Sequence, residues 1–181
     1  MKKQTRKVLL GAVTLAAVAA AGHNANAANT TLPMTAKIIA AVQITQNQAL
    51  DFGTLTIHAA KSGTLTVDGV AQTRTAGGAG GISLVGGAGA QEGLFTLKGA
   101  TGVPIEVTAP ATAKINNGGT SLVVDKFTIN NAAGTINATP FVRTLAAATE
   151  TGFKVGGRLT VPAASGVGTY NGTVTLTALY Q

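Results

Sequence analysis

The sequence lacks cysteine and tryptophan altogether, and it contains only six acidic residues among 181. The absence of cysteine excludes disulfides, thiol nucleophiles and metal sites built on thiolates. A domain without disulfides has to obtain its stability from a packed core, and this chain is long enough to form one. Because only five Phe and two Tyr are present, we expect that core to consist mainly of Val, Ile, Leu and Ala.

Histidine is nearly as scarce, since the chain contains only His23 and His58. His23 falls in an N-terminal segment that we expect to be removed, and no serine lies in a recognisable nucleophile motif. We therefore interpret His58 as a residue at the end of a strand. The acidic residues match no calcium-binding loop, although a carboxylate pair that forms only in space, as in glycosidases, stays open. The sequence thus predicts a protein that is not an enzyme and has no cofactor or metal site.

The N-terminus has the three parts of a secretory signal. Four basic residues lie within residues 2–7, an apolar run follows from Val8 to Gly22, and Ala25 and Ala27 occupy the positions that a signal peptidase reads. The apolar run is short for a membrane span and no basic stop-transfer cluster follows it, which disfavours a membrane anchor. We predict that residues 1–27 form a helical signal peptide, cleaved after Ala27, that directs export through the Sec route to the periplasm and then to the cell surface or beyond.

Removal of this signal would take four of the thirteen Lys and Arg residues with it and lower the net charge from +7 to +3. The remaining basic residues are scattered and are not interleaved with aromatic residues, so the pattern gives no support for nucleic-acid binding. No further long apolar run follows, and we expect no integral membrane segment after cleavage.

Beyond residue 27 the hydrophobic pattern has a period of two almost throughout, which is typical of half-buried β-strands. Short strands of this kind, separated by turn residues, predict an all-β fold, an immunoglobulin-like antiparallel β-sandwich. We expect residues 28–46 to form an N-terminal strand and residues 47–181 to form the main domain. Two dipeptides predict local geometry: Asp68-Gly69 suits a two-residue type I′ hairpin turn, and Gly156-Gly157 suits a bulge within a strand.

The final strand, residues 169–181, carries Tyr180 as the penultimate residue, and Gly168 is the fourteenth residue from the C-terminus. This arrangement resembles the C-terminal signature of pilus subunits assembled by the chaperone–usher route, in which that strand is held by a periplasmic chaperone. The resemblance implies a C-terminal interaction strand with these residues: Gly168, Tyr170, Val174, Leu176 and Tyr180. Packing of Tyr180 as an aromatic of the core is the minimal role that we expect for it.

The opposite end of the mature chain agrees with this resemblance. In pilus subunits an N-terminal extension of alternating apolar residues inserts into a neighbouring subunit, which is a form of β-augmentation. Residues 29–45 resemble such a donor strand, and the apolar residues on its even positions after Leu32 are Met34, Ala36, Ile38, Ala40, Val42 and Ile44. The alternative is that this strand pairs within its own sheet.

Three internal motifs extend the resemblance over most of residues 30–181. They are Leu-Asp-Phe-Gly-Thr at 50–54, Val-Gly-Gly-Arg-Leu-Thr-Val at 155–161 and Gly-Thr-Tyr-Asn-Gly-Thr at 168–173. The first resembles a motif of archaic-type pilins and spore-coat-U-like domains, and together they resemble a bacterial family catalogued only as domain of unknown function number 4402. The chain departs from the pilins that carry a disulfide, since it has no cysteine.

These observations predict an exported structural protein with a pilin-like fold, a subunit of a surface fibre such as a fimbrium, joined by strand donation. Its expected partners are copies of itself or related subunits, together with a periplasmic chaperone and usher. The alternative is a monomeric secreted β-sandwich that acts as a binding or adhesion module. Behaviour in isolation separates the two, because a stable monomer that needs no chaperone favours the alternative.

Overall fold

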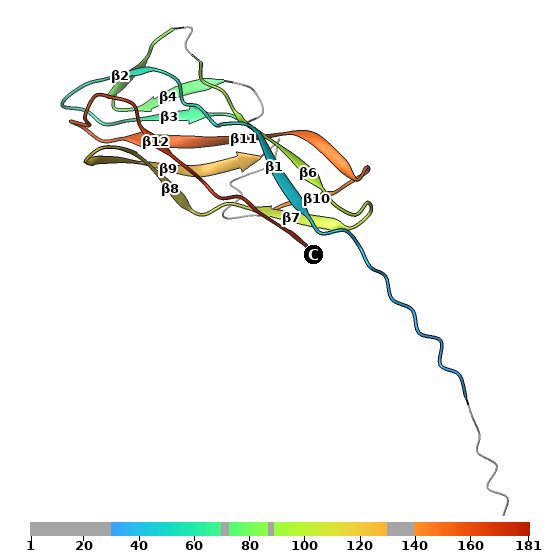
Figure 1. Cartoon of the computed structure of the whole chain (residues 1–181). Coiled ribbons are helices and arrows are strands. Elements are labelled where there is room, and N and C mark those ends of the chain that lie inside the picture. The colour runs from blue at the N-terminus through green and yellow to red at the C-terminus, as the bar shows by residue number, and fades with distance from the viewer. Residues whose placement is uncertain (1–29, 70–72, 87–88, 130–139) are drawn as a thin grey trace, which may run out of the picture. The chain divides into compact units, whose positions relative to one another are not determined.

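The computed structural model describes residues 30–69, 73–86, 89–129 and 140–181. Within these ranges the regular secondary structure consists entirely of β-strands (Figure 1). The predicted signal peptide, with Ala25 and Ala27, lies outside the described residues. In chain order the strands are β1 (Gln43–Gln48), β2 (Leu55–Ile57), β3 (Gly63–Val67), β4 (Arg74–Gly78), β5 (Ile82–Leu84), β6 (Gly93–Lys98), β7 (Pro104–Thr108), β8 (Thr112–Asn117), β9 (Thr120–Ile129), β10 (Phe141–Thr144), β11 (Thr149–Val161), β12 (Asn171–Gly172) and β13 (Thr177–Tyr180). The prediction of an all-β fold is confirmed.

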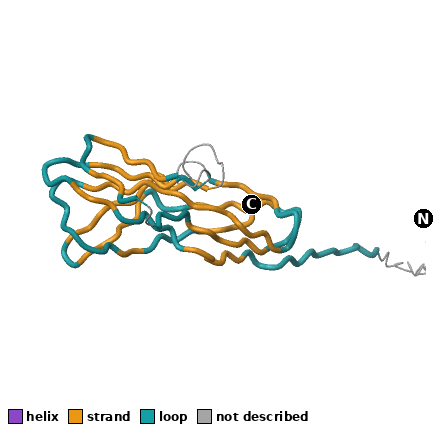
Figure 2. The backbone as a smooth tube through the Cα atoms, turned by 90° about the horizontal axis from the view of Figure 1, so that it is seen from above, coloured by secondary structure: helices purple, strands orange, loops and turns teal. Residues whose placement is uncertain are grey.

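All strand pairs in the described part of the chain are antiparallel. The largest sheet has the order β1-β6-β11-β9-β8-β12, with β3 also paired to β11 and β4 to β3. A second sheet has the order β10-β7-β13, and β2 pairs with β5. Figure 2 shows how the strands run side by side along the domain. Because β1 and β12 are the two ends of the largest sheet, each is an edge strand, and these two edges border the candidate site.

The long strand β11 changes partners along one edge, from β6 at Thr149–Val155 to β3 at Gly157–Val161. On its other edge the register with β9 shifts between Gly156 and Arg158, which confirms the predicted bulge. A Cβ atom at Gly156 would overlap the Val67 carbonyl oxygen and would lie 2.8 Å from Thr128 Oγ1. Only glycine therefore allows β3, β9 and β11 to meet at this point.

The core has the composition that the sequence predicts. Aliphatic side chains from both sheets enclose three phenylalanines, Phe95, Phe127 and Phe153, each of which is at most 5% exposed. The rings of Phe95 and Phe153 stack with centroids 5.3 Å apart, and Phe141 meets Phe153 edge to face at 5.9 Å. Stacking of this kind stabilises the core beyond the area that it buries.

Three strands differ from the prediction. The alternating segment that begins at Leu32 becomes a regular strand only at Gln43, and residues 30–42 carry no strand. The hairpin between β3 and β4 forms, but Val67 pairs with Arg74, so the two-residue turn at Asp68-Gly69 is wrong and the connection spans residues 68–73. The final strand is interrupted, since residues 173–176 separate β12 from β13.

Residues Lys37–Gln181 form one compact unit, and the chain up to Ala36 falls outside it. Within the residues that the structure describes, no helix is long and apolar enough to cross a membrane.

Candidate functional site

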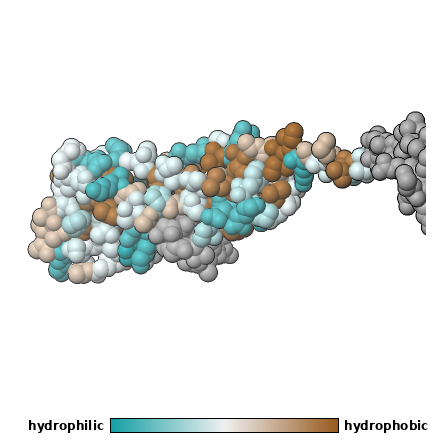
Figure 3. All heavy atoms as spheres, turned by 90° about the horizontal axis from the view of Figure 1, so that it is seen from below, coloured by the Kyte–Doolittle hydropathy of each residue, from teal (hydrophilic) through white to brown (hydrophobic). Residues whose placement is uncertain are grey.

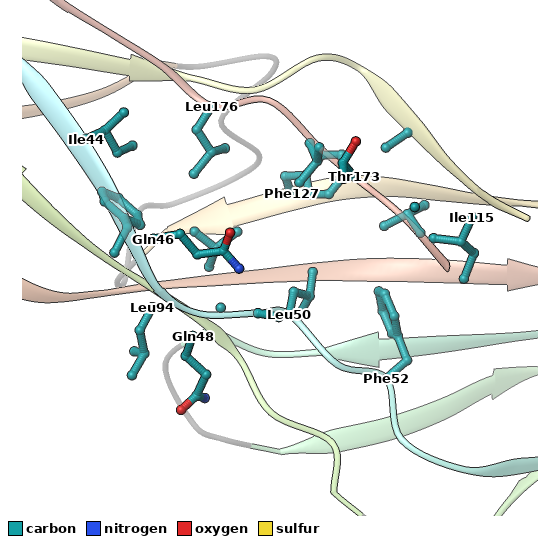
Figure 4. Close-up of a pocket in the computed structure, with 18 residues that line it drawn as sticks. Ile44, Gln46, Gln48, Leu50, Phe52, Leu94, Ile115, Phe127, Thr173 and Leu176 are labelled. Carbon is teal, nitrogen blue, oxygen red and sulfur yellow. The ribbon is translucent and has the colours of Figure 1, made fainter. Parts of the chain in front are cut away.

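An apolar groove of about 310 Å³ lies between β1 and the chain segment that follows β12. One wall comes from β1 and the residues after it, and the other comes from the C-terminal segment around residues 172–176. Figure 4 shows side chains from both walls together with the core residue Phe127. The lining residues are Ile44, Gln46, Gln48, Ala49, Leu50, Phe52, Gly93, Leu94, Phe95, Ala113, Ile115, Val124, Phe127, Val155, Gly172, Thr173, Val174 and Leu176. Core side chains thus form the floor of the groove.

The groove is open because each wall is paired on one side only. β1 pairs with β6 from Gln43 opposite Lys98 to Gln48 opposite Leu94. The C-terminal segment pairs with β8 through β12 and with β7 through β13. In the described part of the chain, no strand pairs with the edge of either wall that faces the groove. The free edge of β1 and the segment that follows β12 therefore face an apolar floor, and an edge strand beside an apolar surface is the arrangement that accepts an added strand.

The Leu-Asp-Phe-Gly-Thr motif shapes one wall of this groove. Asp51 Oδ1 accepts a hydrogen bond from the Gly53 N–H at 2.7 Å, and Gly53 adopts a φ of 68°, which favours glycine. Asp51 also exchanges two backbone hydrogen bonds with Gln91, both of 2.8 Å. This tight turn holds the side chains of Leu50 and Phe52 in the wall. The Leu-Asp-Phe-Gly-Thr motif therefore has a physical role in shaping the groove.

The guanidinium of Arg74 supports the same turn from the opposite side. It donates hydrogen bonds to the carbonyl oxygens of Phe52 and Thr54, each at 3.4 Å, and to that of Val85 at 2.8 Å. Three carbonyl groups from two loops are thereby tied to one side chain. The wall of the groove is consequently held by the body of the domain.

The predicted C-terminal residues separate into three places. Val174 and Leu176 line the groove and pack half-buried against the core. Gly168 and Tyr170 lie at the loop before β12, where the Tyr170 hydroxyl donates to the Gly166 carbonyl at 2.7 Å. Tyr180 ends β13 and packs half-buried against the core, in agreement with its minimal expected role.

The predicted donor residues also divide. Val42 and Ile44 are half-buried against the domain's own core, and Ile44 lines the groove. Met34 and Ile38 are 93% and 95% exposed, and Ala36 and Ala40 are exposed as well. On the face seen in Figure 3, apolar side chains gather mainly at one end, among more hydrophilic neighbours. Exposure of such large apolar side chains to water is unfavourable, and association with another surface would bury them.

Charged side chains lie outside the groove lining, which is neutral throughout. The ion pairs join Arg158 to Asp125 at 2.6 Å, Arg143 to Glu150 at 2.7 Å and Lys154 to Glu92 at 3.1 Å. Within the described ranges no three His, Asp or Glu side chains cluster in a way that could hold a metal. The groove therefore offers apolar contact and backbone hydrogen bonding rather than acid–base chemistry.

His58 directly follows the end of β2, and its Nδ1 accepts a hydrogen bond from the Ala60 N–H at 3.3 Å. This position confirms the interpretation of His58 as a residue at the end of a strand.

Several groove residues carry no signal in the predicted pattern, among them Gln46, Gln48, Ala113 and Ile115. The even-numbered series that ends with Ile44 continues through Gln46 and Gln48 to Leu50 and Phe52. Within β1 the alternation explains Ile44, Gln46 and Gln48, because alternate residues of a strand share a face, and beyond the end of β1 the lining continues through residues 49, 50 and 52.

Comparison with known proteins gives one match. A family model described as "Domain of unknown function (DUF4402)" matches residues 42–180. No curated protein and no solved structure matches the chain. The matched region begins at Val42, immediately before β1, and includes both walls of the groove.

Proposed function

The chain belongs to the DUF4402 family of domains of unknown function, and from this premise we propose that it is an exported, pilin-like subunit of a surface fibre. In this proposal the alternating segment at the N-terminus of one copy fills the apolar groove of the next copy. The single observation that carries the proposal is that one chain contains both an open apolar groove beside the edge strand β1 and an exposed segment of alternating apolar residues.

The groove supports the proposal because it provides what a single added strand needs. The free edge of β1 offers backbone groups to which a strand can hydrogen-bond, and alternate apolar side chains of that strand would face half-buried lining residues such as Leu50, Phe52 and Leu176. The neutral lining favours an apolar occupant over a charged one.

The exposed segment supports the proposal from the other side. Leu32, Met34 and Ile38 are between 80% and 95% exposed. Burial of a side chain of this size contributes roughly 1.5–3 kcal/mol. Odd positions such as Thr31 and Thr35 are polar, so an inserted strand would bury one face and leave the other in contact with water.

Export through the Sec route, passage through the periplasm and delivery by a chaperone and usher belong to the same proposal. A chaperone would occupy the groove before a second copy does, because an open strand edge otherwise promotes aggregation.

Charged substitutions in the segment test the proposal. We expect the double variant Met34→Asp/Ile38→Asp to abolish fibres, because it places two carboxylates against an apolar floor. The matched control is Thr31→Asp/Thr35→Asp, which adds the same charge on the other face of the segment and should still assemble. Fibres are scored by electron microscopy and by SDS-resistant ladders.

Because all four positions are exposed, both double variants should keep the melting temperature of the single subunit. Equal assembly by the two variants would contradict the proposal. A wild-type protein that stays a stable monomer without a chaperone would favour the monomeric binding module.

A further inference from the structure

The phenol of Tyr180 joins three segments that are distant in the sequence. Its hydroxyl donates a hydrogen bond to the Ala40 carbonyl oxygen at 2.7 Å. The same hydroxyl accepts a hydrogen bond from the Ala100 backbone N–H at 2.6 Å. The three partners are the C-terminal strand β13, the turn after β6 and the chain that leads into β1, and they meet at one oxygen atom.

The turn after β6 is shaped to receive this phenol. A Cβ atom at Gly99 would lie 2.7 Å from the Tyr180 hydroxyl oxygen and 3.1 Å from Ile105 Cδ1. Only glycine leaves room for the hydroxyl at this position. The ring packs half-buried against the core, so its position is fixed by packing as well as by its two hydrogen bonds.

Ala40 is the point where the exposed segment ends and the domain begins. Ile38, two residues before it, is 95% exposed, whereas Val42, two residues after it, packs against the core. β1 starts at Gln43 and contacts β13. The hydrogen bond to Ala40 therefore ties the backbone immediately before the first strand to the last residue of β13.

We propose that Tyr180 is a positioning residue that fixes the root of the N-terminal segment, so that every copy presents residues 30–39 from the same point. Its role in fibres rests on the proposed function, whereas the anchoring is a property of a single chain. A fixed root would limit the angles that successive copies can adopt and so make the fibre stiffer.

The first experiment measures the anchor in a monomer. Tyr180→Phe keeps the ring and deletes both hydrogen bonds, and it is introduced into the Met34→Asp/Ile38→Asp chain, which we expect to be monomeric. We expect the ¹⁵N order parameters of residues 39–41 to fall from about 0.85 to below about 0.6. Tyr170→Phe is the matched control, because its hydroxyl bonds Gly166 and it does not line the groove. It should leave these order parameters unchanged.

A second variant covers the case in which Tyr180→Phe folds poorly. Gly99→Ala keeps the tyrosine, but the added methyl group displaces the Tyr180 hydroxyl from its position between Ala40 and Ala100. We expect this variant to lower the order parameters of residues 39–41 in the same way. Unchanged order parameters in both Tyr180→Phe and Gly99→Ala would overturn the anchor, whether or not the protein forms fibres.

The second experiment measures the consequence in fibres of the otherwise wild-type chain. We expect Tyr180→Phe fibres to have a persistence length at least twofold shorter than that of the parent, measured from electron micrographs. An unchanged persistence length would overturn the role in fibres. If residues 39–41 loosen but the wild-type chain forms no fibres at all, the anchor stands and the proposed function fails.

Discussion

At the scale of single residues, the best-defined electrostatic contact lies across β9 and β11. The guanidinium of Arg158 donates two hydrogen bonds to the carboxylate of Asp125, at 2.8 and 2.6 Å. These hydrogen bonds and the charge of Arg158 hold the pKa of Asp125 below its ordinary value of 3.8. Both side chains are partly exposed, so water and salt screen the pair.

The pH dependence of stability follows from the direction of this shift. Because the folded protein holds the proton of Asp125 less tightly than the unfolded chain, the carboxylate stabilises the fold above pH 3.8, and this contribution is lost as the pH falls through the lower, folded pKa. We expect Asp125→Asn to lower the free energy of unfolding by about 0.5–1 kcal/mol at neutral pH.

Urea unfolding at pH 7 and in acid below the lowered pKa of Asp125 in the folded protein checks this expectation. The gap between the wild type and Asp125→Asn should narrow in acid, where the wild-type carboxyl is protonated. A gap of equal size at both pH values would show that the variant acts through something other than the charge.

At the scale of elements, the bulge of β11 depends on close approach at Gly156. We expect Gly156→Ala to lower the free energy of unfolding by about 2–3 kcal/mol, because the added methyl group meets the backbone of β3 and forces the strands apart. Gly119→Ala is the matched control, since a Cβ atom there meets nothing within 4 Å. It should change the free energy of unfolding by less than about 0.5 kcal/mol. Similar destabilisation by both variants, measured by chemical denaturation, would refute this account of the bulge.

Alternation predicted elements well where each strand has its partner in the same chain. The all-β fold, the aliphatic core and the bulge at Gly156-Gly157 all follow from period, composition and glycine placement. The strand predicted from Leu32 onward does not form before Gln43. Alternation indicates which face a strand would bury, but it does not identify the strand with which it would pair. In the described part of the chain, residues 30–42 have no such partner, so only residues 43–46 of the predicted strand join a sheet.

The site itself was only half visible in the sequence. Val174 and Leu176 belong to an apolar series and are predicted as interaction residues, whereas Ile44 is predicted as a donor residue and instead lines the groove of its own domain. The prediction omits Gln46 and Gln48, because polar side chains in a strand do not indicate an apolar wall. The anchoring role of Tyr180 depends on contacts with Ala40 and Ala100, which are 140 and 80 residues away in the sequence. No local pattern encodes contacts at such separations.

At the scale of the whole molecule, the groove should lower the stability of an unfilled domain, because half-buried apolar side chains such as Leu50, Phe52 and Leu176 line an open surface. A chain that begins at Ala40 keeps β1 and the anchor while lacking the alternating segment. We expect a synthetic peptide of residues 29–41 to raise its melting temperature. At a free peptide concentration of about one hundred times the dissociation constant, binding would raise the free energy of unfolding by about 2.7 kcal/mol.

Thermal unfolding with increasing peptide concentration measures this stabilisation. The control peptide carries Asp in place of Met34 and Ile38 and should give no shift. Equal shifts with both peptides would contradict recognition of the apolar face.

One groove and one alternating segment on the same chain also determine how copies would associate. A copy that gives its segment to one neighbour and receives a segment from another uses two different surfaces, so the contact is head-to-tail rather than two-fold symmetric. Such an assembly has polarity: one end always carries an empty groove and the other an unused segment. A different protein that fills the empty groove would stop growth at the end that carries the groove. A copy that lacks its own segment would stop growth at the other end, because it accepts the unused segment and offers none in return.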